Sequence, residues 1–473
     1  MQVPDLGSAT IPHLQELRDG GELTAVALTL AYLQRIEELD DRIRAVIALD
    51  PTASGQAAAS DARHRAGTLR GPLDGIPVLL KDNIDTADLP TTAGSRALTG
   101  APPARDAALV TVLHAAGAVV LGKTNLSEWA NFRSTHSTSG WSSVGGQTVN
   151  PHVLDRSPCG SSSGSGAAVA AALCQVAIGT ETDGSIVCPA GINGIVGLKP
   201  TLGLVDGTGI VPLSAEQDTA GPMARHVIDA ALTLGVLAGR AYPIGPDALR
   251  GTRIGVWRKA GADADADRVF AAAVDTVVAQ GATVIDVVLP FAREIDEAEY
   301  PAMLTEFRRD LEPYLRTRPD APQTLPALMA FNEQDPVALA RFGQELFEHS
   351  AAAPDGDDPD YRRQRATVTE LARRCIDETL ARHDLIAIMA PTNGPAWAID
   401  YEAGDAGSVG SSRPAAVAGY PNIAVPAGAA GPLPIGVSFF AGRGTEATLI
   451  DLAAAFEAAT RARREPRLLP TLP

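Results

Sequence analysis

SPCGSSSGSGAAVAAALCQVAIGTETDGSIVCPAG, residues 157–191, contains two clusters of glycine and small hydroxyl residues that flank an apolar, alanine-rich segment. A flexible Gly/Ser linker stays polar throughout, whereas both clusters here adjoin residues that favour burial. The apolar segment predicts a buried helix, followed by a short strand at residues 176–178. We therefore expect backbone N–H groups and hydroxyls to be fixed inside a core, as they are where a nucleophile and its oxyanion donors are presented.

Predicted strands and helices alternate outward from this stretch. Thr24 is a candidate N-cap for a packing helix, and residues 132–160 are polar, glycine-rich and typical of a functional loop. The alternation indicates an α/β fold, in which helices cover a sheet, and no linker divides the 473 residues. Apolar runs predict strands at residues 45–49, 76–80, 118–121, 176–178, 282–289, 385–390, 423–426 and 435–440, and helical patterns fall at residues 106–116, 265–280 and 446–461.

Composition excludes several classes of function. The net charge of −17 leaves no basic patch for a nucleic-acid backbone. The N-terminal MQVPDLGSAT lacks the basic and apolar regions of a secretory signal, and no apolar run has transmembrane length, so we expect a cytoplasmic protein with no membrane partner. Four cysteines without a C-x-x-C pair fit reduced residues in such a protein. The eight histidines show no metal-ligand spacing, so we expect no metal and no cofactor.

Lysine is scarce in this chain. Only four of the 39 basic residues are lysines, at positions 81, 123, 199 and 259. Because nearly all basic residues are arginines, we expect the few lysines at positions where arginine cannot substitute. A desolvated lysine, unlike arginine, can become neutral and act as a base. Lys81 directly follows the apolar run IPVLL and is the best candidate for a buried base at a strand end.

The run Gly160–Gly164 also satisfies G-x-S-x-G, which makes Ser162 a candidate nucleophile of an α/β-hydrolase elbow. An elbow needs a strand directly before the serine, and the preceding NPHVLDRSPC is a poor strand, so we reject this interpretation. A phosphate-binding loop is also rejected, since no Lys-Ser/Thr follows the glycines. His136 and His152 lie in the long polar loop, where we expect exposed residues rather than cleft-lining ones.

With these alternatives rejected, the remaining candidate is a serine nucleophile that is activated by a lysine base. A serine hydroxyl needs a base to remove its proton, and a neutral lysine does this directly or through a second hydroxyl. In the second cluster, Thr182–Ser185 follows the predicted strand 176–178, and the consecutive N–H groups of such a turn can converge on a developing oxyanion.

The chain resembles the amidase signature family of serine hydrolases. The resemblance covers nearly all of it, through GIPVLLKDNID, LGKTNLSEWANF, CGSSSGSGAAVAA, AIGTETDGSIVCPA, GIVGLKPTLGLV, QDTAGPM, AGYPNIAVPAG and LPIGVSFF. It implies the amidase signature fold: a single large α/β/α domain, residues 1–473, with a mixed central sheet covered by helices. The core motifs then lie at about 70–230 and 385–461, with a mostly helical insertion at about 290–383.

The resemblance also assigns roles to residues. Lys81 falls on the family's catalytic lysine, Ser185 on its acyl-accepting serine and Ser161 on its bridging serine, which that family holds through a cis peptide bond. The backbone N–H groups of Thr182, Asp183, Gly184 and Ser185 would form the oxyanion hole. Ser162 would support the network or serve the turn alone.

Three residues depart from the family's common G-T-D-T-G-G-S-I-R wording. Glu181 replaces Asp, Asp183 replaces Gly and Val187 replaces Arg. A carboxylate at 183 directed inward would oppose an oxyanion, so we expect Asp183 to point away from it.

This variant wording is similar to that of the bacterial peptide amidases. The similarity implies hydrolysis of the C-terminal carboxamide of peptides to free acid and ammonia, with a peptide or small-molecule amide as substrate and no obligate protein partner. The alternatives are a broader aliphatic or aryl acylamidase, an amidotransferase A-type subunit, and a non-catalytic amide-binding scaffold.

Overall fold

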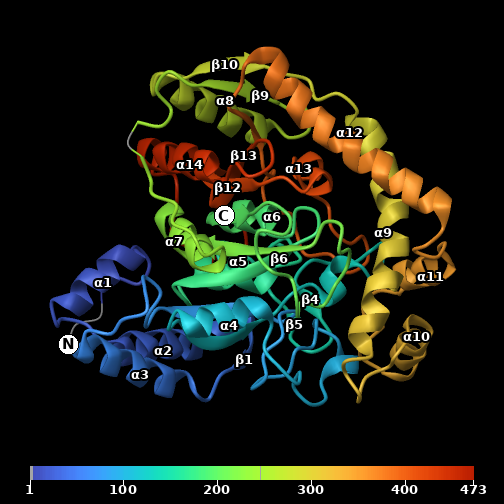
Figure 1. Cartoon of the computed structure of the whole chain (residues 1–473), viewed down its shortest axis with the longest axis horizontal. Helices are drawn as coiled ribbons and strands as arrows, with labels where there is room; N and C mark the ends of the chain where they lie inside the picture. The colour runs from blue at the N-terminus through green and yellow to red at the C-terminus, as the bar shows by residue number, and fades with distance from the viewer. Residues whose placement is uncertain (1–3, 246, 408) are drawn as a thin grey trace.

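Eleven strands form a mixed central sheet in the order β1-β3-β2-β6-β8-β7-β12-β13-β11-β9-β10 (Figure 1). The structure is a computed structural model that describes residues 4–245, 247–407 and 409–473. The strands are β1 Val46–Leu49, β2 Pro77–Lys81, β3 Val119–Thr124, β6 Val176–Glu181, β7 Val196–Lys199, β8 Thr219–Ala224, β9 Arg253–Val256, β10 Thr283–Asp286, β11 Ala387–Pro391, β12 Asn422–Ala430 and β13 Leu433–Phe440. Each predicted strand overlaps one of these, although β10 is four residues long where eight were expected.

The sheet is parallel where the first glycine-rich cluster meets it. β2 pairs in parallel with β3 on one side and with β6 on the other, whereas β6 pairs antiparallel with β8. Every residue of β2 and β6 is buried, which explains their continuous apolar character. Because β2 and β6 run in the same direction, their carboxyl ends meet at one edge of the sheet.

Helices flank the sheet (Figure 1). Thr24 caps the second helix as predicted, since its hydroxyl accepts a hydrogen bond from Ala27 N at 3.1 Å. Of the apolar residues that recur at helical spacing in this helix, Leu28, Tyr32 and Ile36 are buried and Leu33 is half-buried. The flanking helices are α1 Ile11–Asp19, α2 Ala25–Ile43, α3 Ala53–Ala66, α4 Ala108–Ala115, α5 Ser163–Ala170, α6 Val187–Asn193, α7 Val227–Leu237, α8 Ala264–Ala279, α13 Arg413–Ala418 and α14 Glu446–Thr460.

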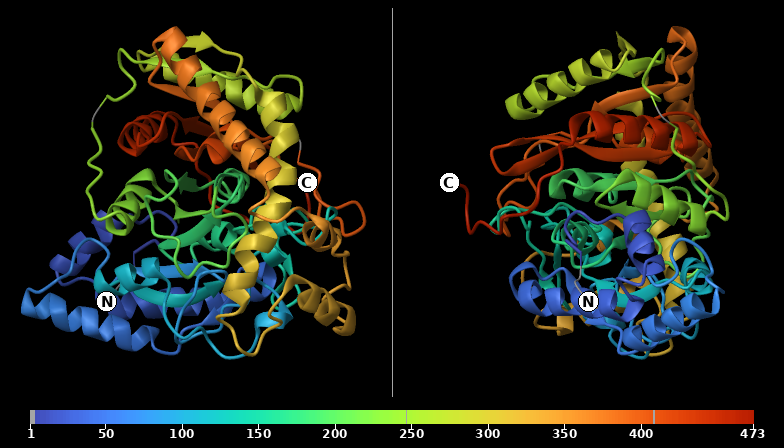
Figure 2. Two further views of the ribbon diagram at one scale, coloured as in Figure 1. Left: turned by 45° about the vertical axis from the view of Figure 1, so that its right-hand side comes forward. Right: turned by 90° about the vertical axis from the view of Figure 1, so that its left-hand side faces the viewer.

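Between β10 and β11 the chain is mostly helical. It forms α9 Ala292–Leu315, α10 Leu325–Gln334, α11 Glu345–Ala352 and α12 Pro359–His383. α9 and α12 pack against each other along one side of the molecule (Figure 2). An apolar cluster joins α9 and α11 to the start of the polar loop 132–160 and the residues before it: Phe307, Leu311 and Phe347 pack with Trp129 and Phe132.

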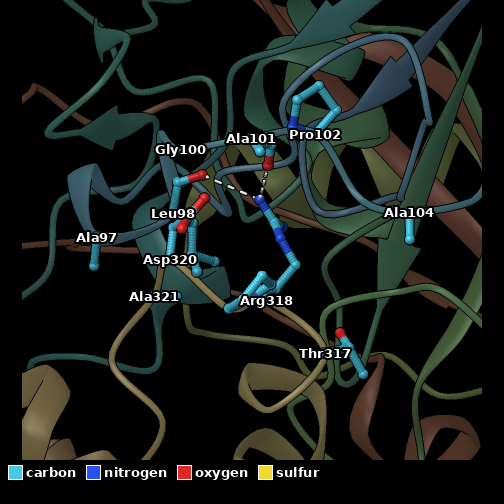
Figure 3. A pocket seen from close by; sticks show the side chains of 11 residues that line it. Ala97, Leu98, Gly100, Ala101, Pro102, Ala104, Thr317, Arg318, Asp320 and Ala321 are labelled. Carbon is cyan, nitrogen blue, oxygen red and sulfur yellow. Dashed lines mark hydrogen bonds between the residues drawn. The ribbon is translucent and has the colours of Figure 1, made fainter.

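Arg318, which follows α9, forms a second attachment of this helical segment. Its guanidinium donates to the carbonyls of Leu98 and Ala101 at 3.3 and 3.0 Å, beside a cavity of about 130 Å³ (Figure 3). These contacts fix the end of α9 to a loop that follows β2. The helical segment is therefore anchored close to the strand that ends at Lys81.

The loop 132–160 contains a small hairpin, β4 Trp141–Ser142 paired with β5 Gly146–Gln147, and is otherwise irregular. No helix within the described ranges is both long and apolar enough to cross a membrane.

The expectation that all four cysteines are reduced is wrong for two of them. Cys159 and Cys188 form a disulfide, with Cα atoms 6.2 Å apart and a sequence separation of 29. Spacing alone gave no sign of it, because the fold brings the segment before α5 against the first turn of α6. Cys174 and Cys375 are free and buried, as expected.

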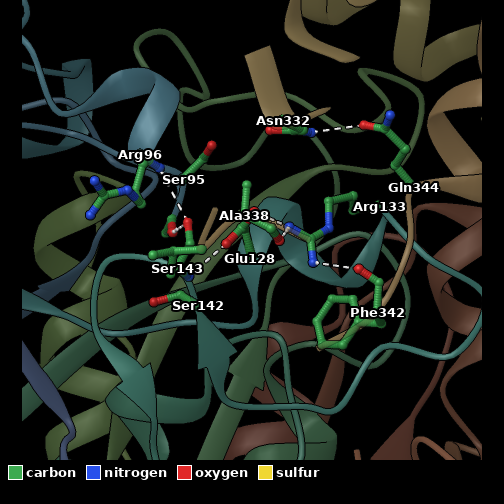
Figure 4. A network of polar contacts seen from close by, with 12 residues as sticks. Ser95, Arg96, Glu128, Arg133, Ser142, Ser143, Asn332, Ala338, Phe342 and Gln344 are labelled. Carbon is green, nitrogen blue, oxygen red and sulfur yellow. Dashed lines mark hydrogen bonds and ion pairs between the residues drawn. The ribbon is translucent and has the colours of Figure 1, made fainter. Parts of the chain in front are cut away.

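A buried ion pair connects the polar loop to the helical segment (Figure 4). Arg133 Nη1 donates to Glu128 Oε1 at 2.6 Å and to the carbonyl of Ala338, and the other oxygen of Glu128 accepts from Ser143 N at 2.6 Å. Neither charged side chain is exposed. The guanidinium also lies over the ring of Phe342, 4.5 Å from its centroid.

We predict that Arg133→Met destabilises the protein strongly. The variant leaves the Glu128 carboxylate buried without its cation, which costs about 3–5 kcal/mol when one partner of a buried pair is removed. Urea titration of the variant and the parent measures the difference. Arg293→Met is the matched control, because Arg293 and Glu297 form a pair with 85% and 64% of their side chains exposed, and its loss changes stability by less than about 1 kcal/mol. Equal effects of the two substitutions would contradict the prediction.

Candidate active site

Lys81 is the last residue of β2 and lies beside the end of β6. The parallel register pairs Leu80 with Ile178, so the lysine side chain meets Thr180 two residues further on. Lys81 Nζ lies 2.7 Å from Ser161 Oγ, 2.9 Å from Thr180 Oγ1 and 3.1 Å from the Thr180 carbonyl. Asn83 Nδ2 donates to the same threonine hydroxyl at 2.9 Å. The structure thus brings together the lysine and the Ser161 hydroxyl, the pair that the family resemblance implies.

Burial determines the charge state of Lys81. Its side chain is fully buried, and this desolvation lowers the pKa of Lys81 to about 7, against the opposing effect of Asp218 and Glu181. Within the described residues no carboxylate lies within ion-pair distance of its Nζ. The amino group is therefore available as a neutral base near neutral pH.

Ser161 is held by the irregular segment that precedes α5. The Gly160–Ser161 peptide bond is cis, as the family resemblance implied. The carbonyl of Ser161 accepts a hydrogen bond from Ser127 N at 3.1 Å. A Cβ at position 160 would lie 2.2 Å from Ser127 Oγ, so only glycine fits this close approach.

Ser162 is occupied with structural hydrogen bonds. Its hydroxyl donates to the Thr180 carbonyl at 3.0 Å and accepts from Thr180 N at 3.2 Å. Its own backbone N–H donates to the carbonyl of Ser185 at 3.2 Å. The segment before it is not a strand, so the hydrolase-elbow interpretation of Ser162 fails here, and the residue instead ties the two serine clusters together.

The second cluster forms the turn between β6 and α6. Gly184 has φ +80°, a left-handed conformation that favours glycine, and a Cβ there would lie 3.0 Å from Ser412 Oγ. Ser185 is 9% exposed, whereas Lys81 and Ser161 are completely buried. In the hydrogen-bond network of the described chain, none of the N–H groups of residues 182–185 donates to another group. The partly accessible Ser185 thus lies in the same turn as a row of free N–H donors.

The side chain of Glu181 binds the end of the turn, where α6 begins. Its Oε2 accepts from the N–H groups of Ile186 and Val187 at 2.7 and 3.0 Å, at the start of α6. Burial raises the pKa of Glu181, while Lys199 opposes that change. The carboxylate therefore fixes the N-terminus of α6, and the free N–H donors are confined to residues 182–185.

Residues of the QDTAGPM motif hold the start of the turn. Thr182 Oγ1 donates to Asp218 Oδ1 at 2.5 Å, and Gln217 Nε2 donates to the Thr182 carbonyl at 3.2 Å. Gln217 also contacts the helical segment, since it donates to Glu299 Oε1 at 2.9 Å and accepts from Arg365 at 2.8 Å.

Asp183, the added carboxylate, is paired with a cation. Its oxygens accept from Ser412 Oγ at 2.5 Å and Arg413 Nε at 3.2 Å. Arg413 is also within 2.5 Å of Glu299 and 2.8 Å of Asp296. These partners belong to α9 and to the start of α13, which agrees with the expected orientation of Asp183 away from the oxyanion donors.

Sequence reasoning missed several of these residues. Thr180 could have been predicted, because the parallel pairing of β2 with β6 places it beside Lys81. Arg413 and Glu299 gave no signal, since they lie more than 100 residues from the turn that they contact. His136 is exposed as expected, but His152 is buried. Its Nε2 donates to the Asn193 carbonyl at 3.0 Å, and burial lowers the pKa of His152 to about 4.

No cluster of three or more potential metal ligands occurs among the residues that the structure describes. The described site brings together a buried lysine, serine hydroxyls and a row of free N–H groups. The Amidase family profile matches residues 27–450, so the chain belongs to the amidase family and is an amide-hydrolysing enzyme of the amidase signature type.

Known proteins resemble it along nearly their whole length. The solved structure of native peptide amidase from Stenotrophomonas maltophilia is 48% identical with a TM-score of 0.92, covering 98% of this chain and 99% of that one. A probable amidase from Arabidopsis thaliana is 38% identical over 98% of this chain and 92% of its own length. An amidase family protein from Bacillus anthracis, also of solved structure, is 32% identical with a TM-score of 0.87, covering 98% of this chain and 93% of that one.

Proposed function

We propose that this amidase uses Ser185 as nucleophile, Ser161 as proton relay and Lys81 as base. The observation that carries the proposal is the 2.7 Å contact between Lys81 Nζ and Ser161 Oγ at a lysine whose burial lowers its pKa to about 7. A base is most effective when its pKa lies near the working pH. Ser185 is the one of the three that is not completely buried, so it is the one that a substrate reaches.

The reaction proceeds in two halves. Neutral Lys81 accepts the proton of Ser161, which takes the proton of Ser185 as Ser185 Oγ attacks the amide carbonyl. The proton returns through Ser161 to the leaving nitrogen, the C–N bond breaks, and ammonia departs from a carboxamide. Water then enters, gives its proton along the same route and releases the acid from the acyl-enzyme.

The free N–H groups of residues 182–185 stabilise the negative oxygen of the tetrahedral intermediate. They need no reorganisation, because Glu181, Asp218 and Gln217 hold both ends of the turn. Preorganised donors of this kind contribute about 10²–10³ in rate for each group. The cation at Arg413 offsets the charge of Asp183, so that this carboxylate does not oppose the oxyanion.

We further propose that the substrate is a peptide with a C-terminal carboxamide. The resemblance to the Stenotrophomonas peptide amidase supports this choice, and so does the TETDG wording at residues 180–184. The proposal includes action as a single chain without an obligate partner. A cytoplasmic location was also expected, but the Cys159–Cys188 disulfide favours an oxidising compartment.

Ser185→Ala should lower kcat by about 10³ or more, because it removes the atom that forms the acyl-enzyme. The parent should react covalently with a fluorophosphonate probe at Ser185, and the variant should not. The matched control is Ser350→Ala, a buried serine on α11 whose hydroxyl has no hydrogen-bond partner within the described residues, and it should retain both properties. Undiminished turnover in Ser185→Ala would refute the assignment.

The rate should depend on pH through Lys81. Only the neutral amine accepts a proton, so kcat/KM should be constant above the lysine pKa of about 7 and fall about tenfold per pH unit below it. Lys81→Arg should be inactive across the same range, because a guanidinium stays protonated. A pH–rate profile from about pH 5 to about pH 9 on both proteins measures this. A profile in which activity rises as the pH falls would contradict the role of Lys81.

A substrate panel tests the proposed specificity. We expect ammonia release from peptide amides to exceed that from short aliphatic and aryl amides in kcat/KM by at least about tenfold, a difference of about 1.4 kcal/mol in transition-state binding. Internal peptide bonds of the same peptides should stay intact, as judged by mass spectrometry. Preference for anilides would favour an aryl acylamidase, and co-purifying partner chains would favour an amidotransferase.

A further inference from the structure

The only disulfide among the described residues lies between the two segments that carry the serines. Cys159 precedes Ser161 by two residues, and Cys188 follows Ser185 by three. The covalent bond thus connects the segment of the proton relay to the helix that begins just after the nucleophile. The disulfide takes no part in the proton transfers proposed above.

Little regular structure holds the relay segment. It lies outside any helix or strand until α5 begins at Ser163, and Cys159 itself has φ +57°, so no helical or sheet hydrogen bonds fix it. Two hydrogen bonds link it to the other segment: Ser162 N donates to the Ser185 carbonyl at 3.2 Å, and Asn193 Nδ2 donates to the Pro158 carbonyl at 2.8 Å. The disulfide is the third connection and the only covalent one.

The other segment transmits the constraint directly. Cys188 belongs to the first turn of α6, and its N–H donates to the Gly184 carbonyl at 2.8 Å. A displacement of Cys188 would therefore also displace the turn that contains the free N–H donors and Ser185. On the apolar side the disulfide packs with Val153, Ile192 and Leu433.

We propose that Cys159 and Cys188 are positioning residues, whose disulfide sets the separation of Ser161 and Ser185, so that reduction of the bond lowers turnover reversibly. This inference rests on the roles proposed for the two serines. Proton transfer between hydroxyls is sensitive to distance, and a misplacement of about 1 Å can cost about 10²-fold in rate. Substrate binding does not depend on that separation, so the loss falls on kcat rather than on KM.

The bond is open to a small reductant. Cys159 is buried, at 6% exposure, while Cys188 is half-buried. The thiolate of a dithiol attacks Cys188 Sγ, the S–S bond breaks and Cys159 leaves as a thiolate that takes up a proton. The second thiol of the reagent then displaces Cys188 as its thiol and closes the reagent's own disulfide, so two electrons and two protons pass to the protein.

The test uses the full chain carrying Cys174→Ala and Cys375→Ala, which leaves only the pair. Free thiols are counted in denaturant before and after treatment with dithiothreitol, and the count should rise from none to two. Reduction should lower kcat on a peptide amide by about tenfold or more, with KM within about twofold. Reoxidation with oxidised glutathione should restore kcat. The Cys159→Ser/Cys188→Ser variant should have the kcat of the reduced enzyme, and dithiothreitol should not change it.

Three results would overturn the inference: two free thiols in the untreated protein, an unchanged kcat in reduced protein whose circular dichroism is native, or unfolding of the reduced protein at the assay temperature. The rate of Ser185 labelling by a fluorophosphonate separates this question from the substrate proposal. If no peptide amide is hydrolysed but labelling slows on reduction and recovers on reoxidation, the substrate assignment fails and the inference stands.

Discussion

The side chain of Lys81 is completely buried and has no ionic partner within the described residues. Its protonation state, on which the proposed role as a base depends, follows from these two properties. Lys123 provides the contrast one strand away. It is equally buried, and burial lowers its pKa as well, but its Nζ lies 3.4 Å from Asp82 Oδ1, and the carboxylates of Asp82 and Asp85 oppose that change. Around Lys81 the nearest partners are the neutral groups of Ser161 and Thr180. The same fold thus holds one buried lysine in contact with a carboxylate and another whose nearest partners are neutral groups.

Both carboxylates that depart from the common family motif, Glu181 and Asp183, have partners in the structure. Asp183 adds a carboxylate two residues before Ser185, and Arg413 at the start of α13 pairs with it. Glu181 keeps a carboxylate at the start of α6, where it binds two N–H groups of the helix N-terminus. A substitution that would oppose an oxyanion in isolation is therefore tolerated, because its charge is paired by a residue brought in from far along the chain.

Much of the fold and the core of the site could be predicted from the sequence. Apolar runs bounded by Gly and Pro marked strands such as β2 and β6, and placing Lys81 at a strand end followed from one of those runs. The serine assignments came from family motifs rather than from periodicity. The Arg413 contact, the burial of His152 and the disulfide were beyond reach, because each depends on which distant segments the topology brings together.

The helical segment between β10 and β11 cannot be considered a passive cover. Gln217 accepts from Arg365 of α12, donates to Glu299 of α9 and donates to the carbonyl of Thr182 in the turn. Burial raises the pKa of Glu299 to about 8, and the nearby Asp183 adds to that effect. Since Arg413 contacts both side chains, one guanidinium links Glu299 of α9 to Asp183 of the turn that contains Ser185. Repacking of these helices would therefore change the electrostatics of the turn as well as its shape, which couples the helical segment to the turn that contains Ser185.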